Sequence, residues 1–417
     1  MFRTIPLLLT AALLAGCTRT APLPTDAQAH TTVLTVTSPD PTLSDAQLEQ
    51  RYGAKLITRT ATFAVLTTSR SGLRAQNAGV SAQPDHVIRS PLRAAGSVNL
   101  WGEGSVGLWG EGSVSLWGDG SVALWGDGHS SAETANHDTW QALGLSAAHT
   151  RQPTAGANTT TTIAVLDTGL DLDHPMFQAS LSPRSTWKDF VDHDATPHDE
   201  GEFGSGLTGH GTEVAGLALI VAPHATLMPI RVLDETGRGD ASAVAAGIVW
   251  AADHGADIIN LSLGADQPVD AITEAVAYAN SRGVIITASA GNNGNEGLDY
   301  PAAQFAGSAL NLAVGSHDGA GVKSAFSQYG ALSVTAPGEG LFGPAPQRRL
   351  AAWSGTSMSA PIAAGSAALT LGLTGAPAAA VARLTTTARN TDTLNHASLQ
   401  GKLGAGALDL DAATRPD

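Results

Sequence analysis

The pattern of apolar and polar residues changes character near residue 137. Beyond it, runs of β-branched and aliphatic residues end in Gly or polar residues and alternate with stretches of helical spacing. The strand-like runs are TTIAVLDTG (161–169), ATLMPIRVLD (225–234), ADIINLSLG (256–264), GVIITASAG (283–291) and ALNLAVGS (309–316), and the helical stretches lie at about 210–220, 240–254 and 267–282. Continuous apolar strands that alternate with helices predict an α/β domain over residues 137–415, with a parallel sheet covered by helices on both faces.

A shorter pattern occupies residues 31–92. Strands are expected at TTVLTV (31–36), AKLITRT (54–60), TFAVLTT (62–68) and VSAQPDHVIRS (80–90), and helices at LSDAQLEQRYG (43–53) and near 71–77. This β-α-β-β-α-β order is that of a small ferredoxin-like α+β unit. About 60 residues form only a marginal core, so we expect this unit to pack on the larger domain.

Four consecutive octads of the form S-V-x-L-W-G-[DE]-G fill residues 97–128. Val and Leu lie two positions apart, on one face of an extended segment, and glycines separate the units. The tryptophans would then lie on the other face, at Trp101, Trp109, Trp117 and Trp125. Such a Trp-acid surface suits a ligand or calcium. Four octads are too few to bury a solenoid core, however, so we favour a patterned linker.

Composition and charge limit the functional classes. The 417 residues are 43% hydrophobic and 14% charged, which suits a globular protein of two domains and a leader. The net charge of −15, with no local Lys/Arg cluster to offset it, opposes binding to nucleic acid. Because Cys17 is the single cysteine, the folded part contains no internal disulfide.

The first 17 residues read MFRTIPLLLTAALLAGC. Their apolar stretch is too short to span a bilayer and is typical of a signal peptide. The tetrapeptide ending at Cys17 resembles the bacterial lipobox, where cleavage precedes a cysteine that carries a diacylglycerol and anchors the chain to a membrane. The alternative is an ordinary cleaved signal with an incidental cysteine. Both predict export, with residues 18–30 as a tether.

Residues of catalytic type lie at strand ends and helix starts. Asp167 ends the strand in VLDTG, His210 opens a helix in GHGTEVAG, and Ser357 lies in SGTSMSAP. A serine hydroxyl is a weak nucleophile unless an imidazole takes its proton, and the imidazole needs a carboxylate to orient it. Asn292, in ASAGNNG, adds an amide donor for a developing oxyanion. No Cys/His set suits structural zinc, and no metal site is predicted.

In this order, and in the contexts D-T-G, G-H-G-T-x-V-A-G and G-T-S-M-x-x-P, these residues resemble those of the subtilisin-like serine proteases, or subtilases. Asn292 matches the family's oxyanion asparagine. INLSLG, DYPAA, AVGS, FSQYG and VTAPG follow in family order within about 140–410. The resemblance implies a subtilisin-like fold and an exported serine endopeptidase. Its acyl-enzyme would form on Ser357, with His210 as general base and acid and Asp167 orienting it.

The resemblance also assigns substrate binding. A bound peptide would become an extra strand between two segments, namely Gly237, Arg238 and Gly239, and Ser262, Leu263 and Gly264. By the same analogy, residues 31–92 resemble an inhibitory propeptide that assists folding and is cleaved off within about 90–137. The expected partners are protein or peptide substrates and the chain's own propeptide, and no cofactor is required.

Some positions depart from the family pattern. The stretch from His210 to the Val-Ala-Pro at 221–223 is too short for the calcium loop of typical bacterial subtilisins. That site is therefore expected to be missing; a weaker calcium site elsewhere stays open and is not predicted. Glu213 replaces the family's second histidine, and further replacements follow the nucleophile at Ser359, Ala360 and Ile362. We expect these to alter packing rather than to abolish catalysis.

Alternatives remain for single residues and for the whole chain. His193 and His198 lie in an acidic loop, DHDATPHDE (192–200), which suits a metal site or a solvated loop; we favour the loop. Asp171 and Asp173 read as surface or capping residues. A catalytically dead binding protein is contradicted by the intact catalytic set, and an esterase would need G-x-S-x-G with the order Ser, acid, His.

Overall fold

The computed structural model describes residues 31–69, 79–85, 87–89, 98–101, 114–117, 135–151 and 161–416. The predicted signal peptide with Cys17, the tether and the second helix near 71–77 lie outside these residues. Among the described residues no single helix is long and apolar enough to cross a membrane. One bent pair, Thr356–Thr374 with Pro377–Thr387, reaches the necessary length and apolar composition only when its two helices are taken together.

A seven-stranded sheet forms the centre of the larger domain, and each of its strand pairs is parallel. From one edge to the other its strands are β15 (Val334–Pro337), β14 (Asn311–His317), β13 (Ile285–Ser289), β12 (Ile258–Leu261), β8 (Thr162–Asp167), β10 (Thr226–Arg231) and β9 (Lys188–Asp189). The predicted parallel α/β fold is thus confirmed. The strand order reverses at β8, and ligand sites of open α/β sheets collect at such a reversal.

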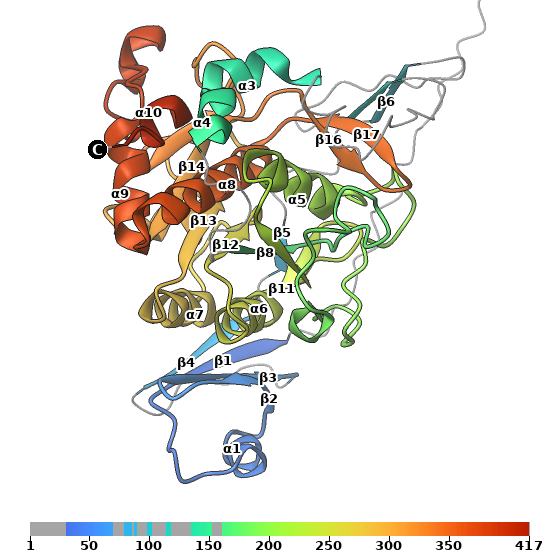
Figure 1. Cartoon of the computed structure of the whole chain (residues 1–417). Coiled ribbons are helices and arrows are strands. Elements are labelled where there is room, and N and C mark those ends of the chain that lie inside the picture. The colour runs from blue at the N-terminus through green and yellow to red at the C-terminus, as the bar shows by residue number, and fades with distance from the viewer. Residues whose placement is uncertain are drawn as a thin grey trace, which may run out of the picture.

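Helices cover both faces of this sheet (Figure 1). On one face lie α5 (His210–Val221) and α8 (Thr356–Thr374), and on the other α6 (Ala241–Asp253) and α7 (Asp270–Ser281). Strand β8 explains the two layers, because Ile163 and Val165 pack into the α5–α8 core while Ala164 and Leu166 pack into the α6–α7 core. Ile163, Val165 and Leu166 each contribute about 1.5–3 kcal/mol when fully buried.

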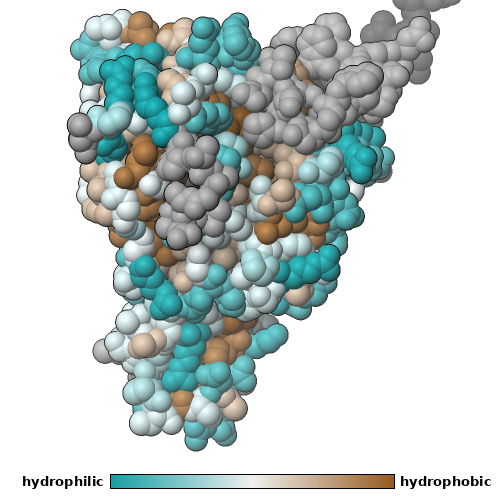
Figure 2. Space-filling view, in the orientation of Figure 1, coloured by the Kyte–Doolittle hydropathy of each residue, from teal (hydrophilic) through white to brown (hydrophobic). Residues whose placement is uncertain are grey.

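Shorter elements complete the larger domain. They are α3 (His137–Leu143), α4 (Leu145–Arg151), α9 (Pro377–Thr387), α10 (Leu410–Ala413), β11 (Arg238–Asp240) and the 3-10 turns Arg184–Thr186, Ala302–Gln304, Asp392–Leu394 and Ala397–Leu399. An ion pair of 2.6 Å between Arg151 and Asp411 ties α4 to α10 near the end of the chain. On the face shown in Figure 2, hydrophobic residues form scattered patches between hydrophilic ones.

The N-terminal residues form a separate four-stranded antiparallel sheet in the order β2-β3-β1-β4. Its elements are β1 (Thr32–Thr37), α1 (Asp45–Tyr52), β2 (Lys55–Arg59), β3 (Phe63–Thr68) and β4 (Val80–Pro84). The predicted helix over 43–53 is present: Ser44 caps its start in a reciprocal pair with Gln47, and Gly53 ends it with φ 60°. Leu34, Leu48 and Leu66 close one face of this sheet under α1.

The other face of the small sheet packs on the larger domain. Val33, Phe63 and Val65 belong to the same buried cluster as the side chains of α6 and α7, below which the sheet lies in Figure 1. The single strand expected over 80–90 is wrong, since the chain leaves the small sheet after Pro84. Residues Val87–Arg89 form β5, which pairs with β11 of the larger domain.

The octads join a third sheet, in the order β16-β17-β7-β6. A hairpin of β16 (Leu341–Ala345) and β17 (Arg349–Trp353) is extended by β7 (Val114–Trp117) and then by β6 (Val98–Trp101). Val98 lies opposite Val114 and Trp101 opposite Trp117 in parallel, so the backbone of the first octad pairs with that of the third. The linker interpretation omitted this pairing with the larger domain.

Candidate active site

Asp167 and His210 meet at the carboxyl end of β8. His210 Nδ1 lies 2.6 Å from Asp167 Oδ1, and both side chains are fully buried. The same carboxylate oxygen accepts the backbone N–H of Thr168 at 2.7 Å. A buried carboxylate is costly unless it is hydrogen-bonded. This paired geometry therefore holds the imidazole with its Nδ1 side toward the acid.

Glycine brings the start of α5 against the end of β8. A Cβ on Gly211 would lie 2.1 Å from the carbonyl oxygen of Gly169, so no other residue fits this contact. Gly209 precedes His210 with φ 95°, in the left-handed region that favours glycine. The two glycines of the G-H-G motif therefore place His210 directly beside Asp167.

The sequence did not single out Asp199 as a member of the site. Its Oδ1 accepts the N–H of Gly209 at 2.9 Å, and its Oδ2 accepts the hydroxyl of Thr212 at 2.6 Å. It thus caps the start of α5, whose N-cap residue has no side chain to do so. Burial raises the pKa of Asp199 to about 6, although these hydrogen bonds oppose the shift.

The expectation of a solvated loop over 192–200 is therefore only partly right. His193 is exposed, but Asp199 at the loop's end is buried. Arg231, itself buried, bonds to Asp189 at 3.1 Å, pairs with Glu200 at 3.4 Å and also contacts Asp192. Within the described part of the chain, no group of three His, Cys, Asp or Glu side chains is arranged to hold a metal ion. The buried arginine explains why this loop is acidic.

Asp171 was expected at the surface or as a cap, and it is buried. Its Oδ1 accepts the N–H of Asp173 at 3.2 Å and its Oδ2 that of Gln347 at 2.9 Å. Gln347 lies in the β16–β17 turn. The carboxylate therefore links the loop after β8 to the hairpin that carries the octad strands.

Ser357 lies in the first turn of α8, beyond the carboxyl end of β12. Its Oγ is 3.4 Å from the carbonyl oxygen of Ser262, and the Ser262 hydroxyl in turn donates to the Ser357 carbonyl at 2.7 Å. Trp353, at the end of β17, packs edge-on against the ring of His210, with the two ring centroids 5.7 Å apart. The structure thus connects the segment of Ser357 to the expected peptide-binding segment, and the strand before it to His210.

Asn292 presents a buried amide group with one unpartnered end. Its Oδ1 accepts both the backbone N–H and the hydroxyl of Thr356, each at 2.9 Å. Its Nδ2 is buried without a hydrogen-bond partner. Since an unsatisfied buried N–H is costly, a preorganised donor of this kind suits a ligand oxygen. Thr356, which the sequence did not single out, fixes the amide with its nitrogen free.

The expected peptide-binding segments hold a strand of this chain itself. Residues 87–89 pair antiparallel with 238–240, placing Arg89 opposite Arg238. On the other side, Arg89 N donates to Gly264 O at 3.1 Å and Gly264 N donates to Arg89 O at 2.9 Å. Strand β5 thus lies between β11 and the segment that follows β12, with Ile88 fully buried.

The replacements after Ser357 are accommodated by packing. Ser359 Oγ donates to the carbonyls of Ala336 and Pro337 at 3.1 and 3.0 Å, and Ala360 and Ile362 are fully buried. Glu213 differs from these, because both of its carboxylate oxygens are buried without a partner, beside Gly343. Burial raises the pKa of Glu213 well above its usual value.

Unfolding free energy is expected to fall as the pH rises above about 4.5, the usual pKa of a glutamate. The folded chain holds the Glu213 proton more tightly than the unfolded chain, so this contribution is complete at lower pH and is lost toward the raised pKa. The slope is at most about 1.4 kcal/mol per pH unit. Glu213→Gln removes this pH-dependent contribution. The unfolding free energy of the variant, measured in urea, should therefore rise relative to that of the unmodified chain between pH 5 and 8. Parallel pH curves for the two would contradict this.

Comparisons with known proteins follow the same residues. The model of the subtilase family matches residues 158–406. Thermitase from Thermoactinomyces vulgaris is 40% identical over 218 residues, which cover 50% of this chain and 73% of thermitase. Subtilisin BL from Lederbergia lenta is 36% identical over 264 residues, 61% of this chain and 90% of that protein. A solved cold adapted subtilisin-like serine proteinase is 30% identical, with a TM-score of 0.48 and coverage of 55% of this chain and 82% of the other.

Proposed function

This chain belongs to the subtilase family and is a serine endopeptidase that acts on proteins or peptides, and from that premise we propose a role for each residue of the site. Ser357 is the nucleophile, His210 the general base and then acid, and Asp167 the group that orients His210. Asn292, with the backbone N–H of Ser357, stabilises the oxyanion. The observation that carries this assignment is the buried 2.6 Å contact between His210 and Asp167.

The chemistry follows from these positions. As Ser357 Oγ attacks the peptide carbonyl, His210 takes its proton, and Asp167 stabilises the resulting imidazolium. The carbonyl oxygen becomes negative and meets the Nδ2 of Asn292, which needs no reorganisation because Thr356 already holds the amide. His210 then protonates the leaving amine. Water hydrolyses the acyl-enzyme by the same steps in reverse, and no cofactor is needed.

A sulfonyl fluoride tests the nucleophile directly. It should form a covalent adduct with Ser357 that mass spectrometry places on the peptide containing this residue, with parallel loss of casein hydrolysis. Labelling of another serine, or labelling of Ser357 without loss of activity, would remove Ser357 from the nucleophilic role.

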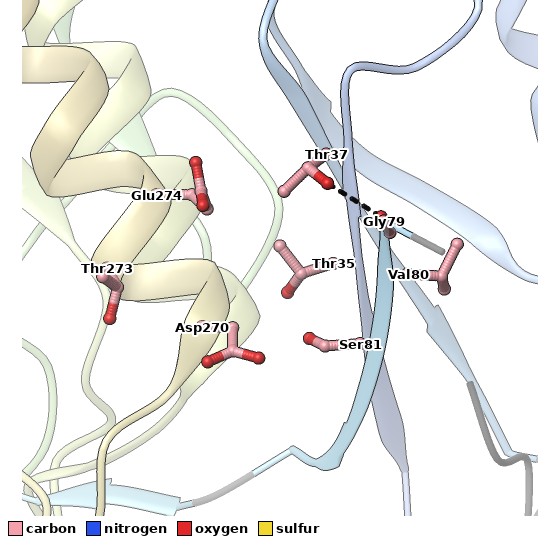
Figure 3. A pocket seen from close by; sticks show the side chains of 8 residues that line it. All are labelled: Thr35, Thr37, Gly79, Val80, Ser81, Asp270, Thr273 and Glu274. Carbon is pink, nitrogen blue, oxygen red and sulfur yellow. Dashed lines mark hydrogen bonds between the residues drawn. The ribbon is translucent and has the colours of Figure 1, made fainter. Parts of the chain in front are cut away.

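We further propose that residues 31–92 are an inhibitory propeptide. Strand β5 occupies the place of a substrate strand, between β11 and Gly264. Two side chains just before it cap helices that have no side-chain cap of their own: Asp85 accepts the N–H of Ser242 at 3.1 Å, and Gln83 accepts that of Asp270 at 2.8 Å. A pocket whose lining residues are mostly Thr, Ser, Asp and Glu lies between β1, β4 and α7 and interrupts the apolar contact (Figure 3), as suits a part that later separates.

Asp85→Ala should weaken propeptide docking about 2- to 30-fold, the effect of removing one helix cap. Its Oδ2 also accepts the Ser242 hydroxyl at 2.8 Å, so both bonds are lost together. The expected result is a shorter lag before casein hydrolysis begins. Asp45→Ala is the matched control, because Asp45 is exposed on α1 and pairs with Arg59, its one ion-pair partner among the described residues. Equal lags for the two variants would sink the proposed role of Asp85.

Export and membrane anchoring complete the proposal. The leader ending at Cys17 supports export, and a lipidated Cys17 would retain the enzyme at a membrane. Cell fractionation of the unmodified chain and of Cys17→Ala distinguishes the two forms of export. Release of the variant alone into the medium is expected, whereas equal release of both would leave an ordinary signal peptide.

A further inference from the structure

Asp299 carries a carboxylate beside the proposed peptide-binding strand, and no step of the proposed chemistry uses it. Backbone hydrogen bonds fix its position: Tyr300 and Ala265 exchange both of theirs, at 2.8 and 2.9 Å, and Asp299 N donates to Ala290 O at 2.9 Å. Asp299 is therefore held between the segment that follows β12 and the segment that follows β13.

Two glycines leave room for this side chain. A Cβ on Gly264 would lie 3.0 Å from the Cβ of Asp299, and a Cβ on Gly291 would lie 2.6 Å from Asp299 Oδ2. Gly264 belongs to the peptide-binding segment, and Gly291 directly precedes Asn292. The carboxylate thus lies between the strand that would hold the substrate and the amide that would hold its oxyanion.

The pairing of β5 shows which substrate residue would come near. Arg89 lies opposite Gly264, so in a substrate strand that continued this antiparallel ladder, the residue two positions further along would lie opposite Ser262. Ser262 O is 3.4 Å from Ser357 Oγ, which makes this the residue whose carbonyl is attacked, P1. P1 would therefore lie against the segment that follows β12, which also holds Asp299.

Asp299 has a place for a cation. Its Oδ1 accepts one hydrogen bond, from Gln328 Nε2 at 3.1 Å, and no Lys, Arg or His of the described residues forms an ion pair with it. Burial is the main cause that raises the pKa of Asp299, and the negative charge of nearby Asp266 raises it further. A positive substrate side chain would gain a charge-assisted hydrogen bond here. An apolar one would bury the carboxylate without a partner.

We propose that Asp299 is a specificity-determining residue that selects Lys or Arg at P1. The proposal rests on the proposed function, since it needs Ser357 as the nucleophile. It names the substrate class: protein segments with a basic residue immediately before the scissile bond.

Within the expected maturation region, about 90–137, the sequence offers one site of this class. Between residues 90 and 150, Arg93 is the single Lys or Arg. Pro91, the second residue after Arg89, has no N–H to donate to Ser262 O, and Arg93 follows two positions later. A shift of two residues keeps each side chain of a strand on its face. Self-processing is therefore expected after Arg93, giving a mature chain that starts at Ala94.

A peptide series that differs only at P1 (Arg, Lys, Gln, Leu, Phe) tests the proposal. For the unmodified enzyme, kcat/KM for Arg and Lys should exceed that for Leu by about tenfold or more, and Asp299→Asn should reduce this ratio about 10- to 100-fold. Titration with sulfonyl fluoride counts the active sites of each preparation. Asp266→Asn is the matched control: it removes a nearby exposed charge, and the ratio should change less than about threefold.

Benzamidine, a positively charged mimic of the arginine side chain, gives a second readout. It should inhibit the unmodified enzyme competitively and lose about tenfold or more in affinity for Asp299→Asn. Preference for Leu or Phe in the unmodified enzyme, or an unchanged ratio in Asp299→Asn, would overturn the proposal while leaving the proposed function standing. Absence of both peptide cleavage and labelling at Ser357 would overturn both.

Discussion

Replacing Ser357 by alanine is expected to lower kcat about a millionfold, a magnitude set by other members of the family rather than by this geometry. Alanine keeps the Cβ and removes only the Oγ that would form the acyl-enzyme. The variant loses the 3.4 Å hydrogen bond from Ser357 Oγ to the Ser262 carbonyl but keeps the 2.7 Å bond from the Ser262 hydroxyl to the carbonyl of residue 357, so the site around it should stay assembled. The measurement is kcat on a peptide with Arg at P1, together with the mass of the chain over time.

Ser359→Ala is the matched control for this variant. It removes a hydroxyl from the same buried helix, two residues on, where the hydroxyl bonds to the carbonyls of Ala336 and Pro337. The loss of such bonds costs on the order of 1 kcal/mol of stability and should spare the chemical step. Ser357→Ala should also remain at full length, uncut after Arg93. A Ser357→Ala enzyme that retained about one-hundredth of the activity would place the nucleophile elsewhere.

The parallel sheet was predictable from the sequence because its inner strands are long apolar runs. Each of the five runs contains an observed strand, from β8 to β14. The edge strands β9, of two residues, and β15, of four, do not lie in comparably long apolar runs, so periodicity does not register them. The octads show a different limit. Their repeat gives the period, but identical units do not say which of them pair, and the structure pairs the first with the third.

The proposed catalytic residues could be singled out because each stands in a motif at an element end, whereas the side chains that support them in the structure could not. Thr356 fixes Asn292 from a position far along the chain, and Asp199 caps α5 from within a loop whose composition is typical of solvent. The same applies to Asp299, which acts through its closeness to Gly264 and Gly291. Only the folded backbone brings these pairs together, so no local pattern could identify them.

Asn292→Ala is expected to lower kcat about 10²–10³-fold with little change in KM, a range that comes from an oxyanion asparagine of another subtilase. Its Nδ2 is buried without a partner in the free chain, so its hydrogen bond forms only when charge develops on the substrate oxygen. An interaction made only in the transition state lowers kcat and kcat/KM equally. The measurement is therefore both constants on one peptide, normalised to titrated active sites.

Two further variants separate the missing donor from a disturbed loop. Asn292→Asp keeps the shape and the acceptor that faces Thr356 but replaces the N–H donor by a second oxygen, so it should be at least as slow as Asn292→Ala. Asn295→Ala removes an exposed amide of the same loop, which bonds only to its neighbour Glu296, and it should keep near-normal kcat. If Asn292→Asp retained activity while Asn292→Ala lost it, the residue would act by holding Thr356 in place. The oxyanion would then have to be stabilised by backbone N–H groups alone.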